Sequence, residues 1–327
     1  GVRHFRAASL LSRKVMERDP WLMRGGGQVR VSHSSLNYKD GLVILGRPGV
    51  VKDWPIVPGI DFAGTVVESK SPKFKPGDAV VHTGWGVGER RWGGMAGLAS
   101  SRGSWLVPLP AGMTPERAMA IGTAGFTAML CVQALEDAGV TPEWAGGAPV
   151  LVTGASGGVG SVAVALLAAR GFTVVASTGR PELEGYLRGL GAAEVVGRAG
   201  LADEAAHRAL DKETYAAAVD TVGGLTLTTA ITRTRYGGAV AACGLAGGGD
   251  VPRLTVFPLI LRNVRLLGVD SVMAVPPLRA RAWDGLACLL SPAALESLTQ
   301  VVPLDQVPPL AADIIDGKVR GRVVVAL

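Results

Sequence analysis

Short apolar runs separated by glycine turns and helical segments form the middle of the chain. The run Val150–Thr153 is rich in β-branched residues and predicts a buried strand. A glycine-rich turn follows it. Residues Ser161–Arg170 are then nearly all small or aliphatic, which predicts a buried helix that Gly171 ends. A second strand is expected at Phe172–Ser177. A strand, a glycine turn, a buried helix and a second strand open a dinucleotide-binding βαβ unit.

The same alternation of strands and helices continues to about residue 262. The further predicted strands are Ala193–Val196, Tyr215–Val219 and Ala239–Cys243, and the predicted helices are Pro181–Leu190 and Leu201–Leu210. Strands that alternate with helices indicate an α/β fold with a doubly wound parallel sheet, which we assign to residues 119–262. In such a sheet, the loops that follow the first, second, fourth and fifth strands should line one groove.

The chain before this region carries the signals of strands and turns. Gln28–His33 alternates like a half-buried strand, and Pro-Gly pairs interrupt the sequence that follows. A helix is expected from Pro115, with Thr114 as its N-cap. The elements predicted after residue 262 are strands at Val264–Val269 and Val323–Leu327 and helices at Pro277–Leu290 and Leu310–Ile315. We expect residues 1–118 and 263–327 to form one discontinuous, β-rich domain.

Composition agrees with two folded domains. The 327 residues are 48% hydrophobic and 18% charged. No membrane span is expected, because the stretch that comes closest to one, Val159–Ala169, is shorter than the roughly 18 residues needed. The three cysteines are widely separated, which favours a reducing, cytoplasmic location. Four basic residues precede the first acid, Glu17. A transit peptide would have this pattern, and so would a first pair of strands; excision from a longer protein is also open.

The formal net charge of +6 raises the question of an anionic partner. Nucleic acid is disfavoured, because the chain has no run of basic residues and no basic-aromatic motif. A basic cleft for small anionic ligands accounts for the sign of the charge as well.

The glycine turn and the end of the second strand indicate which cofactor would bind. Gly154, Gly157, Gly158 and Gly160 allow the backbone to approach a pyrophosphate, whose charge then lies at a helix N-terminus. An NAD site usually has an acid about 20 residues later, for the ribose 2′-hydroxyl. Here the sequence is Ser177-Thr178-Gly179-Arg180. Hydroxyls and a guanidinium suit a 2′-phosphate, so we favour NADPH over NADH. The alternative is that Arg180 is an ordinary solvated surface residue.

Several longer motifs resemble a known family along nearly the whole chain. These motifs are Ser34–Asp40 (SSLNYKD), Pro58–Gly64 (PGIDFAG), Thr83–Glu89 (TGWGVGE), Ile121–Leu130 (IGTAGFTAML), Val152–Ser161 (VTGASGGVGS) and Leu267–Met273 (LGVDSVM). The chain resembles the medium-chain dehydrogenase/reductase superfamily, and within it the zinc-free acrylyl-CoA reductase group of quinone oxidoreductase-like proteins. The resemblance implies a GroES-like β-rich domain with an inserted Rossmann domain that binds NADP. Residues 1–27 match least.

The resemblance implies a set of site residues. The cofactor contacts that it suggests are Tyr38, Thr127, Ser156, Gly157, Gly158, Val159, Thr178, Gly179, Arg180, Arg198, Leu245, Ile260, Ser271 and Asp316. Tyr38 is also the expected catalytic residue, with Asn37 beside it and Asp40 ordering the loop. A phenol can donate a hydrogen bond or a proton, and the alternative is that it only packs against the nicotinamide ribose. Arg90 and Arg91 could meet CoA phosphates or could simply be solvated.

Zinc-dependent members of the superfamily have a cysteine in the first motif and a His-Glu pair in the second. This chain has Ser35 and no cysteine in the first, and Gly59-Ile60-Asp61 in the second. Its four histidines show no ligand spacing, so we predict no metal. The resemblance then implies reduction of an activated C=C bond, acryloyl-CoA to propanoyl-CoA. Hydride from NADPH goes to the β-carbon and a proton to the α-carbon.

Three other functions stay open at this point. One is a zeta-crystallin-like NADPH:quinone oxidoreductase on the same fold, and another is a non-catalytic NADPH-binding structural protein. Nucleic-acid binding is the third. Relatives of this type pair through a sheet edge of the nucleotide domain. We therefore expect a homodimer, with Val264–Val269 as the candidate edge strand.

Overall fold

The structure is a computed structural model that describes residues 26–327, and these divide into two units. The first unit contains the residues up to Thr123 together with Ser271–Ala287 and Leu295–Leu327. The second contains Ala124–Asp270 and Cys288–Ala294. The boundary expected at residue 262 precedes strand β11, which pairs with the sheet of the second unit. The basic N-terminal stretch that suggested a transit peptide lies outside the described residues.

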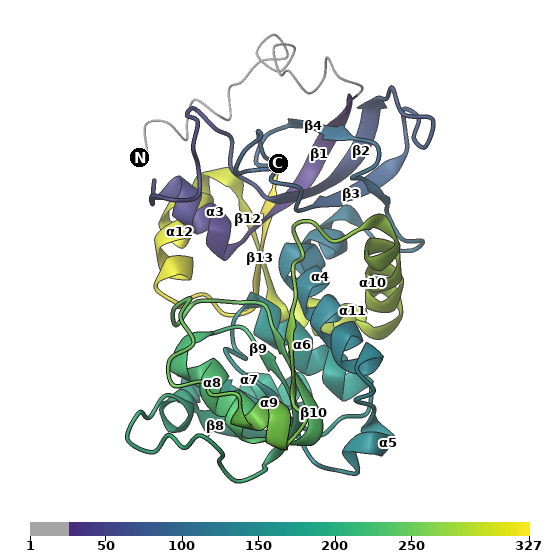
Figure 1. Ribbon diagram of the computed structural model, residues 1–327. Helices are drawn as coiled ribbons and strands as arrows, with labels where there is room; N and C mark the ends of the chain where they lie inside the picture. The colour runs from purple at the N-terminus through teal and green to yellow at the C-terminus, as the bar shows by residue number, and fades with distance from the viewer. Residues whose placement is uncertain (1–25) are drawn as a thin grey trace. The chain divides into compact units, whose positions relative to one another are not determined.

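A seven-stranded sheet is the framework of the first unit. Its strands are β1 (Gly26–Leu36), β2 (Asp61–Glu68), β3 (Ala79–Thr83), β4 (Leu98–Arg102), β5 (Val107–Pro108), β12 (Thr299–Pro303) and β13 (Arg322–Ala326). The order is β12-β13-β1-β2-β3-β5, and β4 also pairs with β1. Because β13 runs antiparallel to β1, with Ala326 opposite His33, the C-terminal strand completes the sheet that the first strand begins. Figure 1 shows the yellow C-terminal strands beside the purple N-terminal one.

The alternating pattern of β1 places its apolar side chains in the core of this unit. Val29 and Val31 are buried, and they pack in one cluster with Phe62 of β2 and Val80 of β3. Burial of each such side chain contributes about 1.5–3 kcal/mol, so the half-buried pattern is sufficient to define which face of the strand turns inward.

Two helices of the first unit pack closely together. They are α3 (Tyr38–Ile44) and α12 (Val307–Ile315). A Cβ atom on Gly41 would lie 2.8 Å from Cγ2 of Ile314 and 3.1 Å from the carbonyl oxygen of Ala311. Only glycine allows this approach, which brings the helix that begins at Tyr38 against the C-terminal part of the chain.

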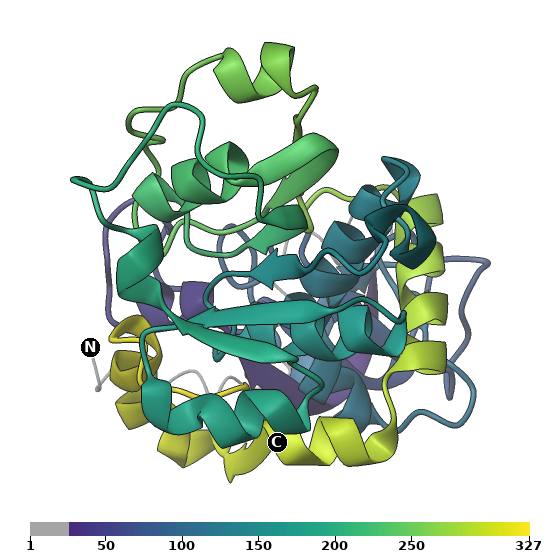
Figure 2. The same ribbon diagram turned by 90° about the horizontal axis from the view of Figure 1, so that it is seen from below.

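The second unit is a doubly wound parallel sheet, as the alternating pattern predicts. Its strands are β6 (Val150–Val152), β7 (Val174–Thr178), β8 (Glu194–Gly197), β9 (Tyr215–Asp220), β10 (Thr234–Ala242) and β11 (Arg265–Gly268). The order β11-β10-β9-β6-β7-β8 places the first strand in the middle, with successive strands added on either side. Figures 1 and 2 show the teal and green strands of this unit side by side, with helices packed along them.

The other helices lie in the connections between these strands, or in the segments of chain before and after them. They are α4 (Pro115–Asp137), α5 (Pro142–Ala145), α6 (Gly158–Ala169), α7 (Glu184–Gly189), α8 (Gly224–Thr232), α9 (Phe257–Leu261), α10 (Pro276–Leu289) and α11 (Pro292–Leu298). Helix α6 contains the small and aliphatic residues of the predicted buried helix, and most of its side chains are buried. A Cβ atom on Gly160 would lie 2.3 Å from the carbonyl oxygen of Gly154, so glycine is required where this helix crosses the turn after β6.

Helix α4 is the longest helix described, and its N-cap agrees with the prediction. The N–H of Arg117 donates to Oγ1 of Thr114. The backbone leaves helical geometry at Gly122, where φ is 52° and ψ is −160°, so two helical segments meet there. By length and composition α4 could cross a membrane, but 94% of its most apolar window is buried in the protein. It is this helix, and not Val159–Ala169, that comes nearest to a span in composition.

The helix predicted at Leu201–Leu210 is wrong. A short 3₁₀ turn ends at Leu201, and irregular chain follows it. Oδ1 of Asp203 accepts hydrogen bonds from the N–H groups of Ala205 and Ala206, which favours a turn over a helix. Residues 202–206 are exposed, so no buried face stabilises a helix there.

Candidate active site and nucleotide site

In the second unit, one carboxylate ties together the loops at the carboxyl ends of three parallel strands. Asp220 ends β9, and its Oδ1 accepts a 2.6 Å hydrogen bond from Oγ1 of Thr153, which follows β6. Its Oδ2 accepts from the N–H of Gly223, and its carbonyl accepts from the N–H of Cys243 after β10. Burial raises the pKa of Asp220, and the bond from Thr153 opposes that rise. Three of the four loops that were expected to line one groove are therefore joined here, those after β6, β9 and β10.

The glycine turn after β6 leads into a helix N-terminus that fits a pyrophosphate. Gly157 is the N-cap of the 12-residue helix α6 and has extended geometry. Gly157, Gly158 and Val159 are half-buried, while Ser156 is 5% exposed. The first-turn N–H groups of a helix have no intrahelical partners, and their dipoles favour an anion. The residues that the resemblance assigns to the pyrophosphate therefore form one such turn.

Two hydroxyls and two guanidiniums gather at the end of β7. Nη2 of Arg180 donates to Oγ of Ser156 at 2.9 Å, and Oγ of Ser156 lies 2.9 Å from Oγ1 of Thr178. The N–H of Arg180 also donates to Oγ1 of Thr178. A Cβ atom on Gly179 would lie 3.1 Å from Cζ of Arg198, so that exposed guanidinium packs over the glycine. This group of donors suits a phosphate monoester. Arg180 is therefore a member of a built cluster and not an isolated surface residue.

The other residues predicted for the cofactor are more dispersed. Thr127 is 5% exposed in α4, and Leu245 is 65% exposed beside the turn at Gly223. Ile260 lies on α9 and is 68% exposed. Ser271 and Asp316 belong to the first unit. Lys318 donates to Oδ2 of Asp316 at 2.7 Å, and this contact is exposed.

A buried polar network surrounds Asn37 in the first unit. Asn37 is 7% exposed, and its Nδ2 donates to Oδ2 of Asp61 at 3.0 Å and to Oδ2 of Asp40 at 3.2 Å. Its Oδ1 accepts from Nη1 of Arg322 at 3.2 Å. The side chain is thus committed to protein partners on both its donor and its acceptor atoms. Asn37 is placed to hold the loop beside Tyr38, and its amide is turned inward.

Asp40 accepts hydrogen bonds from the backbone of this loop and of the Gly59–Ile60 segment. It is fully buried, and its Oδ1 accepts from the N–H groups of Gly59 and Ile60 while its Oδ2 accepts from the N–H of Asn37. Burial, followed by the nearby charge of Asp61, raises the pKa of Asp40 from its ordinary value of 3.8 to about 7. The hydrogen bonds from Asn37 and Gly59 oppose this rise because they favour the ionised form.

The same network contains two buried residues of opposite charge that the sequence did not single out. Asp61 and Arg322 are fully or almost fully buried, and both bind Oγ of Ser35, at 2.7 Å in each case. A Cβ atom on Gly122 would lie 2.4 Å from Nη2 of Arg322 and 2.8 Å from Oδ2 of Asp61. This explains why the Ile121–Leu130 motif carries glycine at that position. The sequence did contain a signal for this network, because a charged residue, Arg322, begins the otherwise apolar strand at residues 322–327. A charged side chain is tolerated in a buried strand only when oppositely charged or hydrogen-bonding groups surround it.

Tyr38 projects from this buried network toward solvent. It is the first residue of α3, directly after the N-cap Asn37, and it is 42% exposed. Within the described residues its hydroxyl makes no hydrogen bond. Next to it, Nζ of Lys39 donates to Oε1 of Glu89 at 2.8 Å. The phenol is therefore accessible, while the backbone that carries it is held on both sides.

The two arginines considered for CoA phosphates differ in their surroundings. Arg90 is exposed. Arg91 is half-buried, donates to the carbonyl of Trp85 at 2.7 Å and lies over the ring of Trp105, with its Cζ 4.9 Å from the centroid. Arg91 is thus part of the loop structure, and Arg90 is the more accessible of the two.

The fully buried histidine of the first unit, His82, is packed in the core, as the sequence suggests. His82 is fully buried, contacts Oγ of Ser101 and the carbonyl of Gly84, and stacks on Phe62. Burial lowers its pKa to about 3, so it is neutral at physiological pH. Between residues 26 and 327 no three His, Cys, Asp or Glu side chains gather as a metal site would require. That the protein uses no metal stays a prediction.

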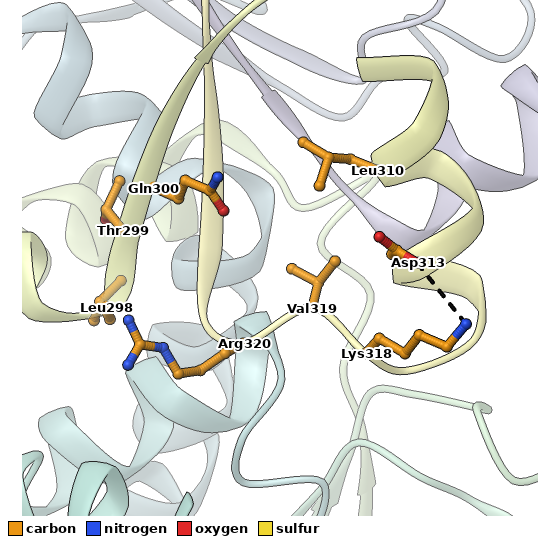
Figure 3. Close-up of a pocket in the computed structure, with 8 residues that line it drawn as sticks. All are labelled: Leu298, Thr299, Gln300, Leu310, Asp313, Lys318, Val319 and Arg320. Carbon is orange, nitrogen blue, oxygen red and sulfur yellow. Dashed lines mark ion pairs between the residues drawn. The ribbon is translucent and has the colours of Figure 1, made fainter. Parts of the chain in front are cut away.

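A surface pocket of about 190 Å³ lies in the first unit. Figure 3 shows its lining, which comes from the end of α11, from β12 and α12, and from the turn that follows α12. Asp313 and Lys318 form an ion pair across one side of it, with an N···O separation of 3.9 Å. None of the predicted site residues lines this pocket, so we do not assign it to catalysis.

Comparison with known proteins agrees with both units. The family model described as alcohol dehydrogenase GroES-like domain matches residues 24–111, and the model described as zinc-binding dehydrogenase matches residues 158–284. The chain is 53% identical over 297 residues to the acrylyl-CoA reductase AcuI of Ruegeria pomeroyi, covering 91% of this chain and 88% of the relative.

Two solved structures extend this similarity to the fold. The YhdH oxidoreductase of Salmonella enterica in complex with NADP is 50% identical, with a TM-score of 0.89 over 93% of this chain and 91% of that one. The YhfP protein of Bacillus subtilis with NAD bound is 45% identical, with a TM-score of 0.87 over 93% and 91%. A curated description of YhfP calls it a putative quinone oxidoreductase, 45% identical over 94% of this chain and 92% of the relative.

The raised pKa of Asp40 predicts a pH-dependent stability. The stabilising contribution of this group is complete below about pH 4 and is lost as the pH rises through about 7, because the folded state holds the proton more tightly. The substitution Asp40→Asn removes this titration. The free energy of unfolding of the variant minus that of the parent should therefore increase between pH 4 and 7, by at most about 1.4 kcal/mol per pH unit. Urea unfolding across this range measures the difference.

Asp305→Asn is the matched control, because Asp305 is exposed in the turn before α12 and its substitution should give a flat difference. The charged groups that face Asp40, Asp61 and Arg322, are unchanged in both variants. A pH-independent difference for Asp40→Asn would contradict the raised pKa and show that Asp40 is ionised throughout.

Proposed function

Because this chain belongs to the acrylyl-CoA reductase group of the medium-chain dehydrogenase/reductase superfamily, we propose that it reduces the C=C bond of a short 2-enoyl-CoA with NADPH. The substrate is acryloyl-CoA and the product propanoyl-CoA. The observation that carries the cofactor assignment is the cluster of Ser156, Thr178, Arg180 and Arg198 at the end of β7. A relative with this overall fold binds NADP.

The second unit supplies the binding groups for this cofactor. The helix that begins at Gly157 receives the pyrophosphate, and Arg180 with Arg198 neutralises the 2′-phosphate. Gly160 keeps the turn tight, because a side chain there would collide with Gly154. When bound, NADPH supplies the hydride that the β-carbon of the enoyl thioester accepts.

The first unit supplies the residues that act on the substrate. Reduction at the β-carbon leaves negative charge on the thioester oxygen, which needs a hydrogen-bond donor. Tyr38 presents an accessible phenol, and Asn37 and Asp40 hold the turn that carries it. We assign Tyr38 as this donor or as the acid that protonates the α-carbon. A solvent molecule is the alternative source of that proton.

Quinone reduction is the second candidate function, and one relative favours it. The YhfP protein covers most of this chain and is described as a putative quinone oxidoreductase. A quinone is also a conjugated carbonyl that accepts hydride, so the same cofactor geometry would serve both substrates. The two differ in whether the CoA moiety contributes to binding.

Steady-state oxidation of NADPH and of NADH, each with acryloyl-CoA, tests the function and the cofactor together. We expect fast turnover with NADPH and slow turnover with NADH. The variant Arg180→Ala should lose about 10- to 100-fold in kcat/KM for NADPH and little for NADH, because one charge-assisted contact to the 2′-phosphate is removed.

The control is Arg188→Ala, which removes an exposed arginine paired with Glu184 on α7 and should leave both values unchanged. Preference for NADH in the parent would overturn the cofactor assignment. Turnover of quinones above that of acryloyl-CoA would favour the second function. NADPH binding without reduction of either substrate would indicate that the protein is a non-catalytic NADPH-binding protein.

Tyr38→Phe separates the two roles of this residue. If the phenol donates to the substrate, kcat should fall by about 100-fold or more while KM for NADPH changes little. Tyr236→Phe is the control, because Tyr236 is exposed on β10. A rise confined to KM for NADPH would contradict the catalytic role and leave Tyr38 as a cofactor contact.

We also propose that two copies of the chain pair through the edge of the second unit's sheet. Strand β11 ends the sheet order, and Leu266 on it is 40% exposed. Phe257 and Leu261 of α9, which precedes β11, are 46% and 57% exposed. An edge strand flanked by exposed apolar side chains is a site for pairing with another chain.

Sedimentation equilibrium should give about twice the 33.6 kDa chain mass for the parent. The double variant Leu266→Lys with Phe257→Lys should give a single chain mass at the same concentration, because charge at the edge opposes pairing. Val301→Lys, on the edge strand β12 of the first unit, should remain dimeric. A monomeric parent, or dissociation only with Val301→Lys, would contradict the proposed interface.

A further inference from the structure

The motif Thr83–Glu89 is not used by the function proposed above, yet its backbone is unusual. Gly84 has a φ of 75°, and a Cβ atom on it would lie 2.8 Å from the carbonyl oxygen of Val272. Trp85 has a φ of 57°, in the left-handed region that bulky side chains rarely adopt. A strained residue of this kind persists only where its surroundings hold it in place.

The segment that approaches this loop is Ser271–Ala274, which precedes α10. The N–H of Trp85 donates to the carbonyl of Val272 at 3.0 Å. The side chain of Met273 is 59% exposed, and those of Ser271 and Val272 are half-buried. Because little of this segment enters the core, its position depends on backbone contacts more than on apolar packing.

Arg279 of α10 makes most of those backbone contacts. Its side chain is 2% exposed. Its Nη2 donates to the carbonyls of Ser271 and Val272 at 3.1 and 2.9 Å, and its Nε donates to the carbonyl of Ala274 at 2.9 Å. Its Nη1 donates to both the carbonyl and Oγ1 of Thr83, at 2.8 Å each. One guanidinium therefore bridges the end of β3 and the Ser271–Ala274 segment.

Aromatic rings add to these contacts of Arg279, and we call the whole set the Arg279 clamp. Cζ of Arg279 lies 4.8 Å from the ring centroid of Trp85, and Trp85 stacks on Trp105 with centroids 5.6 Å apart. The guanidinium of Arg91 lies on Trp105 in turn. Guanidinium–indole stacking is favourable and strongest when desolvated, so the strained Trp85 is held between Arg279 and Trp105.

Burial of an arginine is costly unless every donor finds an acceptor, and here the acceptors are mostly carbonyls of two segments, the end of β3 at Thr83 and Ser271–Ala274. A lysine could supply the charge but not five donors in a plane. The planar guanidinium of Arg279 thus holds two stretches of backbone in a defined position relative to each other, the loop that begins at Thr83 and the segment Ser271–Ala274. Both stretches lead to proposed site residues: one contains Ser271, and the other contains Glu89, which binds Lys39 next to Tyr38.

We propose that Arg279 is a positioning residue of the reductase, which locks the Ser271–Ala274 segment onto the Thr83–Arg91 loop through its backbone carbonyls and through Trp85. The inference rests on the proposed function in one respect: Ser271 and Tyr38 are taken as groups that meet the cofactor and the substrate. The clamp itself is a property of the first unit and is measurable without turnover.

The test compares Arg279→Met, Arg279→Lys and the control Arg281→Met, an exposed arginine on the same helix. Steady-state kinetics with NADPH and acryloyl-CoA should show a loss of kcat of about 10- to 100-fold in Arg279→Met, because displacement of a positioned group by about 1 Å has effects of that size. Arg279→Lys should recover only part of this loss, and Arg281→Met should match the parent.

Hydrogen exchange of the Trp85 amide gives the second readout, independent of activity. The amide donates to Val272, so its exchange should accelerate at least tenfold in Arg279→Met while amides of β1 and β2 stay protected. A variant that has merely lost stability would accelerate all of these amides and retain kcat per folded molecule.

The outcomes separate the two proposals. If the parent reduces acryloyl-CoA and Arg279→Met does so equally well, the positioning role is overturned and the function stands. If the parent does not reduce acryloyl-CoA, the function fails, and the exchange of the Trp85 amide alone decides the clamp. Unchanged exchange in Arg279→Met overturns the clamp in either case.

Discussion

Arg322, near the C-terminus, donates hydrogen bonds to Ser35 and Asn37, which lie more than 280 positions earlier in the chain. The same guanidinium reaches the carbonyl of Ala120, and its charge faces Asp61. A buried charge without partners is strongly unfavourable, so these segments must come together for any of them to be stable. The first unit therefore depends on this network as well as on its apolar core. These contacts between distant residues also help to explain why segments that are separated in the sequence form one unit.

The network determines how the candidate catalytic residue is presented. Asn37 and Asp40 use their polar atoms inward, on Asp61, Arg322 and the backbone of Gly59 and Ile60. Tyr38, between them, is the side chain left facing outward. Buried hydrogen-bonded groups of this kind restrict backbone position more than apolar packing does, because each bond has a preferred direction and length. A rigid turn with one accessible phenol is a suitable support for a group that must meet a small substrate.

The second unit reaches its binding geometry by a different route. Parallel strands bring their carboxyl ends to one edge, and short polar contacts at Asp220 and Thr153 then align the loops. Gly160 allows helix α6 to approach the turn after β6, and Arg180 places a positive charge beside the hydroxyl of Ser156. This chemistry is local in sequence: the turn, the helix and the next strand span about 30 residues of a βαβ unit. For that reason, similar patterns can be recognised in unrelated chains of this fold.

The amino-acid sequence was sufficient to predict the βαβ alternation, the strand character of residues 28–112, the return of the C-terminal strand, and the missing acid after the second strand. These depend on side-chain periodicity and on neighbours close in the chain. It was misleading at Leu201–Leu210, where helical composition lacked a buried face to stabilise a helix. The roles of Asp61, Gly122, Arg279 and Arg322 could be assigned only from the folded structure. Their partners lie far away in sequence, and the energy of a buried polar group depends on which atoms surround it after folding.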